Sequence, residues 1–169
     1  MTWTHRLDEE LQMTDAATAV DPNPATPAGE HAPPAPPAGE HARTMMQRDR
    51  ASAALGMRVE RDDPGHAVVS MRVRDDMTNG FAITHGGLVF ALADTAFAIA
   101  CNEDDRVTVA AGADITFLKS TVAGQTLTAT AVRRRRSGRT GLYDVSVVDE
   151  HGDPVAEFRG RSISTNRSF

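Results

Sequence analysis

The chain has 169 residues, with 18 lysines and arginines against 23 acids and a formal net charge of −5. This length suits one domain with material left for a tail. Seven of the nine prolines lie in residues 1–42, where one base faces seven acids, so the charge divides into −6 for this segment and +1 for residues 43–169. A nearly neutral domain excludes the broad cationic surface that binds nucleic acid.

Residues 1–42 also carry "PAGEHA" twice and contain too few apolar residues to bury a core. We expect a disordered tail here, either a flexible leader or the product of a start codon placed too far upstream, and a folded domain over residues 43–169. The first twenty residues lack the apolar core of a secretory signal, and no run reaches the length of a membrane span. The prediction is a cytoplasmic protein with no membrane partner.

The domain begins with a short helix. Residues 44–55 place apolar and small side chains three to four apart before Gly56, which favours a helix that ends there. The period then changes to two in residues 67–73, where Ala, Val, Met and Val alternate with mostly polar neighbours, as in a half-buried strand. Residues 75–84 contain Asn79-Gly80 and predict a loop.

Residues 86–101 are too long for a strand and apolar on every side of a helical wheel, which predicts a buried helix. Four strand-like segments follow at 107–117, 125–136, 139–149 and 154–164, with short turn sequences between them. In the first of these, the six odd-numbered residues from Val107 to Phe117 are expected on one face. Four strands joined by successive hairpins predict an antiparallel sheet, and a second subunit is expected to cover what one sheet leaves exposed on the helix.

Asp94 is the single charged residue in this helix. Burying an ionised carboxylate without partners costs several kcal/mol, so Asp94 either has a hydrogen-bonding role or lies at a cleft. A structural role, with hydrogen bonds to Thr95 or to backbone, is about as common as a catalytic one.

The helix begins at His85-Gly86-Gly87, which offers free backbone N–H groups and the positive end of the helix dipole to a carbonyl oxygen that becomes an oxyanion. Asp94 lies eight residues later, about 12 Å along the same helix. One helix cannot bring both groups to one reacting atom, whereas two antiparallel helices in a twofold dimer can. The spacing therefore predicts a homodimer with two shared sites.

The segments "NGFAITHGGLVFALADTAFAIACN", "TFLKSTVAGQTLTATA" and "TGLYDVSVVD" resemble the hotdog-fold acyl-CoA thioesterases, and within them the PaaI family of phenylacetic acid degradation. The resemblance runs from about residue 44 to 164 and implies an α+β hotdog fold, with a curved antiparallel sheet of about five to six strands wrapped around a long helix. It also implies hydrolysis of an aryl-acetyl or hydroxyphenylacetyl thioester of coenzyme A, and a homotetramer made from two dimers.

The resemblance implies a role for each matching residue. Gly86, and with it Gly87, would donate N–H to the thioester carbonyl, and Asp94 would activate water or attack directly. The positions expected to line the reacting group or place the water are Asn79, His85 and Thr95.

Phe81 departs from the family pattern, because a polar residue, often His, is expected there. This leaves the acyl preference open. Lys119-Ser120 stands where Arg-Pro is usual and keeps a positive charge near the coenzyme A phosphates, with Arg139 and Arg161 as further candidates.

The run Arg133 to Arg136 is expected to place two arginines on each side of a strand, as a solvated strand end, with phosphate contact as the less favoured reading. Cys101 is the single cysteine, which excludes an intrachain disulfide and a Cys-based zinc site. Its place in the last turn of an apolar helix predicts a core residue. No metal or redox cofactor is expected.

Two alternatives to hydrolysis stay open at this stage. A hotdog dehydratase or hydratase would need a paired acid and base over the substrate's Cα and Cβ. A non-catalytic acyl-CoA-binding module would need the pocket and not the carboxylate of Asp94.

Overall fold

The computed structural model describes residues 39–169, so the predicted tail lies outside it except for residues 39–42, of which the last three belong to the first helix. The helices are α1 (Glu40–Arg48), α2 (Arg50–Ala54), the 3-10 turn η1 (Asp75–Met77) and α3 (Gly86–Cys101). The strands are β1 (Arg58–Asp63), β2 (His66–Arg72), β3 (Arg106–Phe117), β4 (Thr126–Ser137), β5 (Thr140–Val148) and β6 (Pro154–Ser168). Within this range, no helix has the length and apolar character that crossing a membrane requires.

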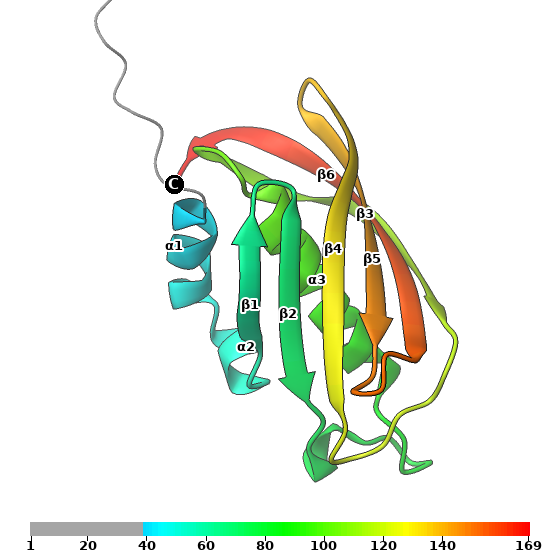
Figure 1. Ribbon diagram of the computed structural model, residues 1–169. Coiled ribbons are helices and arrows are strands. Elements are labelled where there is room, and N and C mark those ends of the chain that lie inside the picture. Colours follow the sequence, from blue (N-terminus) through cyan, green and yellow to red (C-terminus); the bar gives the residue numbers. More distant parts are fainter. Residues whose placement is uncertain (1–38) are drawn as a thin grey trace, which may run out of the picture. The chain divides into compact units, whose positions relative to one another are not determined.

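The six strands form one antiparallel sheet in the order β1-β2-β4-β5-β6-β3, and α3 lies along one of its faces (Figure 1). The expected hairpins between β4 and β5 and between β5 and β6 are present. The expected hairpin between β3 and β4 is wrong, because residues 118–125 carry the chain past the end of the sheet and β3 pairs with β6 instead. This crossing makes β3 an edge strand.

The core lies between α3 and the sheet face beneath it. The inward-facing residues alternate along each strand, as a half-buried strand requires, and they include Ala67, Val69 and Met71 of β2, Leu127, Ala129 and Ala131 of β4, and Tyr143, Val145 and Val147 of β5. Phe97 of α3 packs against Tyr143 and Phe158, with ring centroids 5.3 and 5.9 Å away. These contacts fix the rotation of α3 about its axis.

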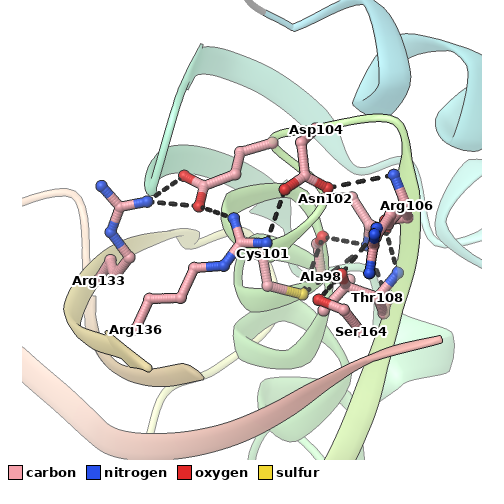
Figure 2. A network of polar contacts seen from close by, with 10 residues as sticks. Ala98, Cys101, Asn102, Asp104, Arg106, Thr108, Arg133, Arg136 and Ser164 are labelled. Carbon is pink, nitrogen blue, oxygen red and sulfur yellow. Dashed lines mark hydrogen bonds and ion pairs between the residues drawn. The ribbon is translucent and has the colours of Figure 1, made fainter. Parts of the chain in front are cut away.

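A polar network fixes the carboxyl end of α3 (Figure 2). Asn102 caps the helix: its amide nitrogen donates to the Ala98 carbonyl at 2.9 Å and to the Thr108 carbonyl at 3.0 Å, and its amide oxygen accepts from the Thr108 N–H at 2.8 Å. Glu103 follows and forms ion pairs with Arg133 and Arg136 of β4. The helix end is thereby joined to both β3 and β4.

The expected alternation of the four arginines is wrong. A bulge between Arg133 and Arg135 shifts the register, so Arg133 and Arg136 reach the same carboxylate, Glu103. Arg136 also pairs with Asp104 at 2.6 Å, and Arg134 pairs with Asp144 at 3.2 Å. Three of the four arginines thus form ion pairs with acidic residues of the same chain.

Two other expectations for the strands need correction. Bulges after Arg106 and after Ala110 interrupt β3, so its odd-numbered residues do not share a face: Ala113 and Ile115 pack against the core, whereas Val109 is exposed. Strand β1 was not expected, because its sequence RVERDD has a single apolar residue and its side chains are largely exposed.

The expected helix over residues 44–55 is two helices. Asp49 ends α1 and caps α2, where its side chain accepts from the Ser52 N–H. A capping aspartate adopts non-helical backbone angles, and this breaks the helix at that residue.

Candidate active site

The amino end of α3 presents one unused backbone donor. His85 is the N-cap, and its Nδ1 accepts from the Gly87 N–H at 3.0 Å. This bond places the proton of a neutral imidazole on Nε2. Among the described residues, the Gly86 N–H has no hydrogen-bond acceptor. Of the two glycines, Gly86 is therefore the one whose N–H is free for a ligand within residues 39–169, whereas the Gly87 N–H serves the cap.

The Asn79 loop closes beside this helix end. An isolated bridge joins Thr78 to Thr84, and the Asn79 amide oxygen accepts from the Phe81 N–H at 2.9 Å. The amide nitrogen of Asn79 has no acceptor within residues 39–169, so it is a second free donor near Gly86. Phe81 itself is 85% exposed.

A cavity of about 330 Å³ lies at the same place. Its lining includes Asn79, Thr84, Gly86, Val89, Phe117 and Lys119. A Cβ at position 86 would lie 3.1 Å from Cζ of Phe117, so glycine lets the aromatic ring approach the helix end. A second cavity, of about 340 Å³ between α1 and β1, contains none of the predicted site residues.

Asp94 lies on the outward-facing side of α3. It is half-buried, its carboxylate has no hydrogen-bond or ion-pair partner among residues 39–169, and burial raises its pKa above the ordinary value. A raised pKa makes a carboxylate a stronger base. The structural alternative requires hydrogen bonds to the Asp94 carboxylate. The described residues form none.

Asp94 does not line the cavity at Gly86. Residues 86–101 form one unbroken helix, so the rise from Gly86 to Asp94 is about 12 Å. Within one chain, the Gly86 N–H and the Asp94 carboxylate are therefore separate.

Thr95 follows Asp94 and faces α2. Its Oγ1 lies 3.1 Å from Oγ of Ser52, which in turn donates to Asp49 at 2.6 Å. Sequence reasoning missed Ser52 and Asp49, although Asp-x-x-Ser at a helix start is a recognisable capping pattern. The contact to Thr95 spans 43 positions of the chain and leaves no local signal.

The three basic residues expected near the coenzyme A phosphates do not gather at one place. Lys119 lines the cavity, and its ammonium contacts Asp149 at 2.7 Å and Asp153 at 2.6 Å. The Arg139 Nε donates to the Ser164 carbonyl, and Arg161 pairs with Asp114. The structure brings Lys119 alone to the cavity at Gly86.

Cys101 is buried, and burial, with the nearby Asp94 carboxylate, raises the pKa of its thiol to about 12. This agrees with the predicted core position. In the part of the chain that the structure describes, no three His, Cys, Asp or Glu side chains gather as a metal site would require.

Comparisons with known proteins agree on one family. A family model described as the thioesterase superfamily matches residues 81–156. The acyl-coenzyme A thioesterase PaaI of Escherichia coli K12 is 46% identical over 121 residues, which cover 72% of this chain and 86% of that protein. The chain belongs to the PaaI family of acyl-CoA thioesterases.

Solved structures of the family share the fold. The structure of E. coli PaaI superposes with a TM-score of 0.74 at 43% identity, covering 76% of this chain and 93% of that one. A mutant form of the phenylacetic acid degradation protein PaaI from Thermus thermophilus gives a TM-score of 0.65 at 38% identity, covering 68% and 97%. The predicted hotdog fold and thioester hydrolase activity of this PaaI-family chain are confirmed.

Family membership also bears on the role of Asp94, the charged residue of α3. A PaaI-family thioesterase acts on acyl-CoA, and the half-buried Asp94 is the one carboxylate in the helix that begins at Gly86. The individual roles of the site residues stay predictions.

The pKa shift of Asp94 predicts that removing its charge stabilises the protein. Above the raised pKa, the folded chain holds a partly desolvated carboxylate that the unfolded chain holds in water, whereas below the ordinary value of 3.8 both states are neutral. We expect Asp94→Asn to melt a few degrees above the parent at pH 7, with the difference shrinking as the pH falls toward 3.8. Thermal unfolding followed by circular dichroism at several pH values measures this.

The matched control is Asp105→Asn, which changes an exposed aspartate beyond the helix and should leave the melting curve unchanged at every pH. An Asp94→Asn protein that melts below the parent at pH 7 would show that Asp94 stabilises the fold.

Proposed function

We propose that this thioesterase hydrolyses aryl-acetyl thioesters of coenzyme A, such as phenylacetyl-CoA and hydroxyphenylacetyl-CoA, at a site shared by two subunits. One observation supports the proposal of a shared site. The Gly86 N–H and the Asp94 carboxylate both lack partners within residues 39–169, and one helix holds them too far apart to meet.

The edge strand β3 supports a dimer of the required geometry. It offers a row of unpaired backbone groups along one side and exposes Val109 and Phe117. Two sheets joined antiparallel through β3 are related by a twofold axis perpendicular to the sheet. Their α3 helices then lie antiparallel on the same face, with the amino end of one beside the middle of the other.

In this arrangement, the partner's helix end binds the thioester oxygen while Asp94 acts on the carbonyl carbon from the facing subunit. In the water route, Asp94 takes a proton from water, the water oxygen bonds to the carbonyl carbon, and the Gly86 N–H stabilises the charge that forms on the carbonyl oxygen. The C–S bond then breaks, and the proton passes to the departing thiolate. Direct attack by the carboxylate needs the same two groups.

An aromatic acyl group suits the surroundings of Gly86. Phe117 lies against the helix end, and Phe81 lies on the adjoining loop with 85% of its surface exposed. Aromatic rings favour stacked or edge-on contact with other rings. The names of the E. coli and Thermus relatives, which refer to phenylacetic acid degradation, support the same substrate class.

Several properties remain part of the proposal. Lys119 contacts the coenzyme A phosphates, exchanging one of its aspartate partners for the ligand, and Arg139 and Arg161 do so from elsewhere on the surface. The enzyme is cytoplasmic, forms tetramers from two dimers, and works without a metal or redox cofactor.

The activity assay tests the proposal directly. We expect the protein to release free coenzyme A from phenylacetyl-CoA, detected with a thiol reagent, faster than from straight-chain acyl-CoA. Asp94→Asn should lower kcat at least about a hundredfold, as removal of a catalytic base does, while sedimentation still shows the dimer. Binding without coenzyme A release would instead identify a binding module, and hydration of unsaturated acyl-CoA a hydratase. An Asp94→Asn protein as active as the parent, or a parent that is active as a monomer, would contradict the shared site.

The Gly86 N–H can be removed without breaking the helix. Gly86 is the first helical residue after the N-cap His85, a position where proline is tolerated because its missing N–H has no intrahelical acceptor. We expect Gly86→Pro to lower kcat by about 10²–10³, as loss of an oxyanion donor does.

Gly86→Ala is the matched control, because it adds a Cβ beside the half-exposed Phe117 and keeps the N–H. It should retain most of the parent kcat. Equal losses in the alanine and proline proteins would assign the effect to crowding and not to the hydrogen bond.

A further inference from the structure

A chain of three side chains connects α2 to the residue after Asp94. Asp49 caps α2 by accepting from the Ser52 N–H at 3.0 Å, and its other carboxylate oxygen accepts from the Ser52 hydroxyl at 2.6 Å. Oγ of Ser52 also lies 3.1 Å from Oγ1 of Thr95. The three residues come from the cap of α2, from α2 itself and from α3.

The carboxylate at one end sets the direction of every proton in this chain. An ionised carboxylate can only accept, so the single hydroxyl proton of Ser52 must go to Asp49. The contact between the two hydroxyls must then use the Thr95 proton, with Thr95 as donor and Ser52 as acceptor. Thr95 is left with lone pairs and no proton for any other group.

Burial keeps this direction fixed. Ser52 is 3% exposed, so solvent water does not compete for its hydroxyl. Burial alone would raise the pKa of Asp49, but hydrogen bonds from the Ser52 side chain and from nearby backbone N–H groups outweigh it and hold that pKa below the ordinary value. Asp49 is thus ionised at neutral pH. Thr95, like Asp94, is only half-buried and still reaches the solvent side of α3.

We propose that Asp49 and Ser52 are positioning residues that turn the Thr95 hydroxyl so that it accepts a hydrogen bond from the water attacking the thioester. This inference rests on the proposed function, and specifically on its water route. It assigns a catalytic effect to two residues of the N-terminal helical segment that do not contact the substrate.

The chemistry needs an acceptor at this place. A water molecule has two protons: Asp94 takes one, and the other must be held so that a lone pair points at the carbonyl carbon. Thr95 with its proton turned toward Ser52 accepts that second hydrogen bond. A Thr95 hydroxyl turned the other way would donate to the water, which draws electron density from the attacking oxygen and leaves the second water proton without this acceptor. The second proton leaves later with the product acid.

Two substitutions test the direction of the chain at nearly constant shape. In Asp49→Asn, the amide oxygen can still accept from the Ser52 N–H and keep the cap, but the amide nitrogen donates to the Ser52 hydroxyl and turns its proton toward Thr95. Ser52→Ala removes the acceptor of the Thr95 proton. We expect each to lower kcat for phenylacetyl-CoA about tenfold with KM within about twofold of the parent, since a misplaced reactant costs rate.

Three further variants separate positioning from structure. Ser52→Thr keeps the hydroxyl and should restore most of the parent kcat. Ser70→Ala removes a hydroxyl that donates to Glu60 on the β1–β2 pair and has no hydrogen bond to Asp49, Ser52 or Thr95, and it should match the parent. In a Thr95→Val background, Asp49→Asn should cause no additional loss of kcat, because it acts through Thr95.

The outcomes are distinguishable from a failure of the proposed function. With an active parent and an inactive Asp94→Asn protein, parent-like kcat in both Asp49→Asn and Ser52→Ala would overturn this inference alone. So would parent-like kcat in Thr95→Val, or an undiminished Asp49→Asn loss in the Thr95→Val background, which would show a structural effect of α2. A parent without thioesterase activity would overturn both proposals.

Discussion

The rigidity of α3 is the constraint on which the site depends. Residues 86–101 form one unbroken helix with the free Gly86 N–H at its first residue and the carboxylate of Asp94 in its middle. A helix cannot bend enough to close a gap of about 12 Å, so the proposed chemistry requires a second copy of the chain. In the proposed dimer, the partly desolvated Asp94 has a role that a single chain does not give it, because its carboxylate faces a substrate bound at the partner's helix end.

Both ends of α3 are held by polar contacts, and these contacts leave the reactive groups free. At the amino end, His85 satisfies the Gly87 N–H and leaves the Gly86 N–H open. At the carboxyl end, Asn102 and the Glu103 ion pairs tie the helix to β3 and β4. Between them, Phe97 fixes the rotation of the helix against the sheet. The position of Asp94 is thus determined by contacts in which its own carboxylate takes no part.

The parts of the structure that could be predicted from the sequence are those in which one sequence signal dominates. The apolar run with Gly-Gly at its start predicted α3 with its bounds, because length and composition both exclude a strand. The spacing of Gly86 and Asp94 predicts a site shared by two subunits, and this stays a hypothesis. Family resemblance added the hotdog fold, which the comparisons confirm.

The incorrect predictions arise where contacts between distant segments override the local sequence pattern. The pairing of β3 with β6 depends on a crossing by residues 118–125 that no local pattern announces. The arginine run failed to alternate because a bulge, visible only against the paired strand, realigned Arg133 and Arg136 toward Glu103. The contact between Ser52 and Thr95 joins segments that are far apart in the sequence. Sequence periodicity does not predict such contacts.

Mixing two inactive proteins tests the shared site most directly. Asp94→Asn lacks the carboxylate and Gly86→Pro lacks the N–H, yet a heterodimer of the two contains one site with both groups intact. After subunit exchange, equal amounts should recover roughly a quarter of the parent activity, since half of the dimers are mixed and each has one working site of two. If differently tagged subunits are shown to exchange and the mixture stays as inactive as its components, the two groups belong to the same chain's site and the account is wrong.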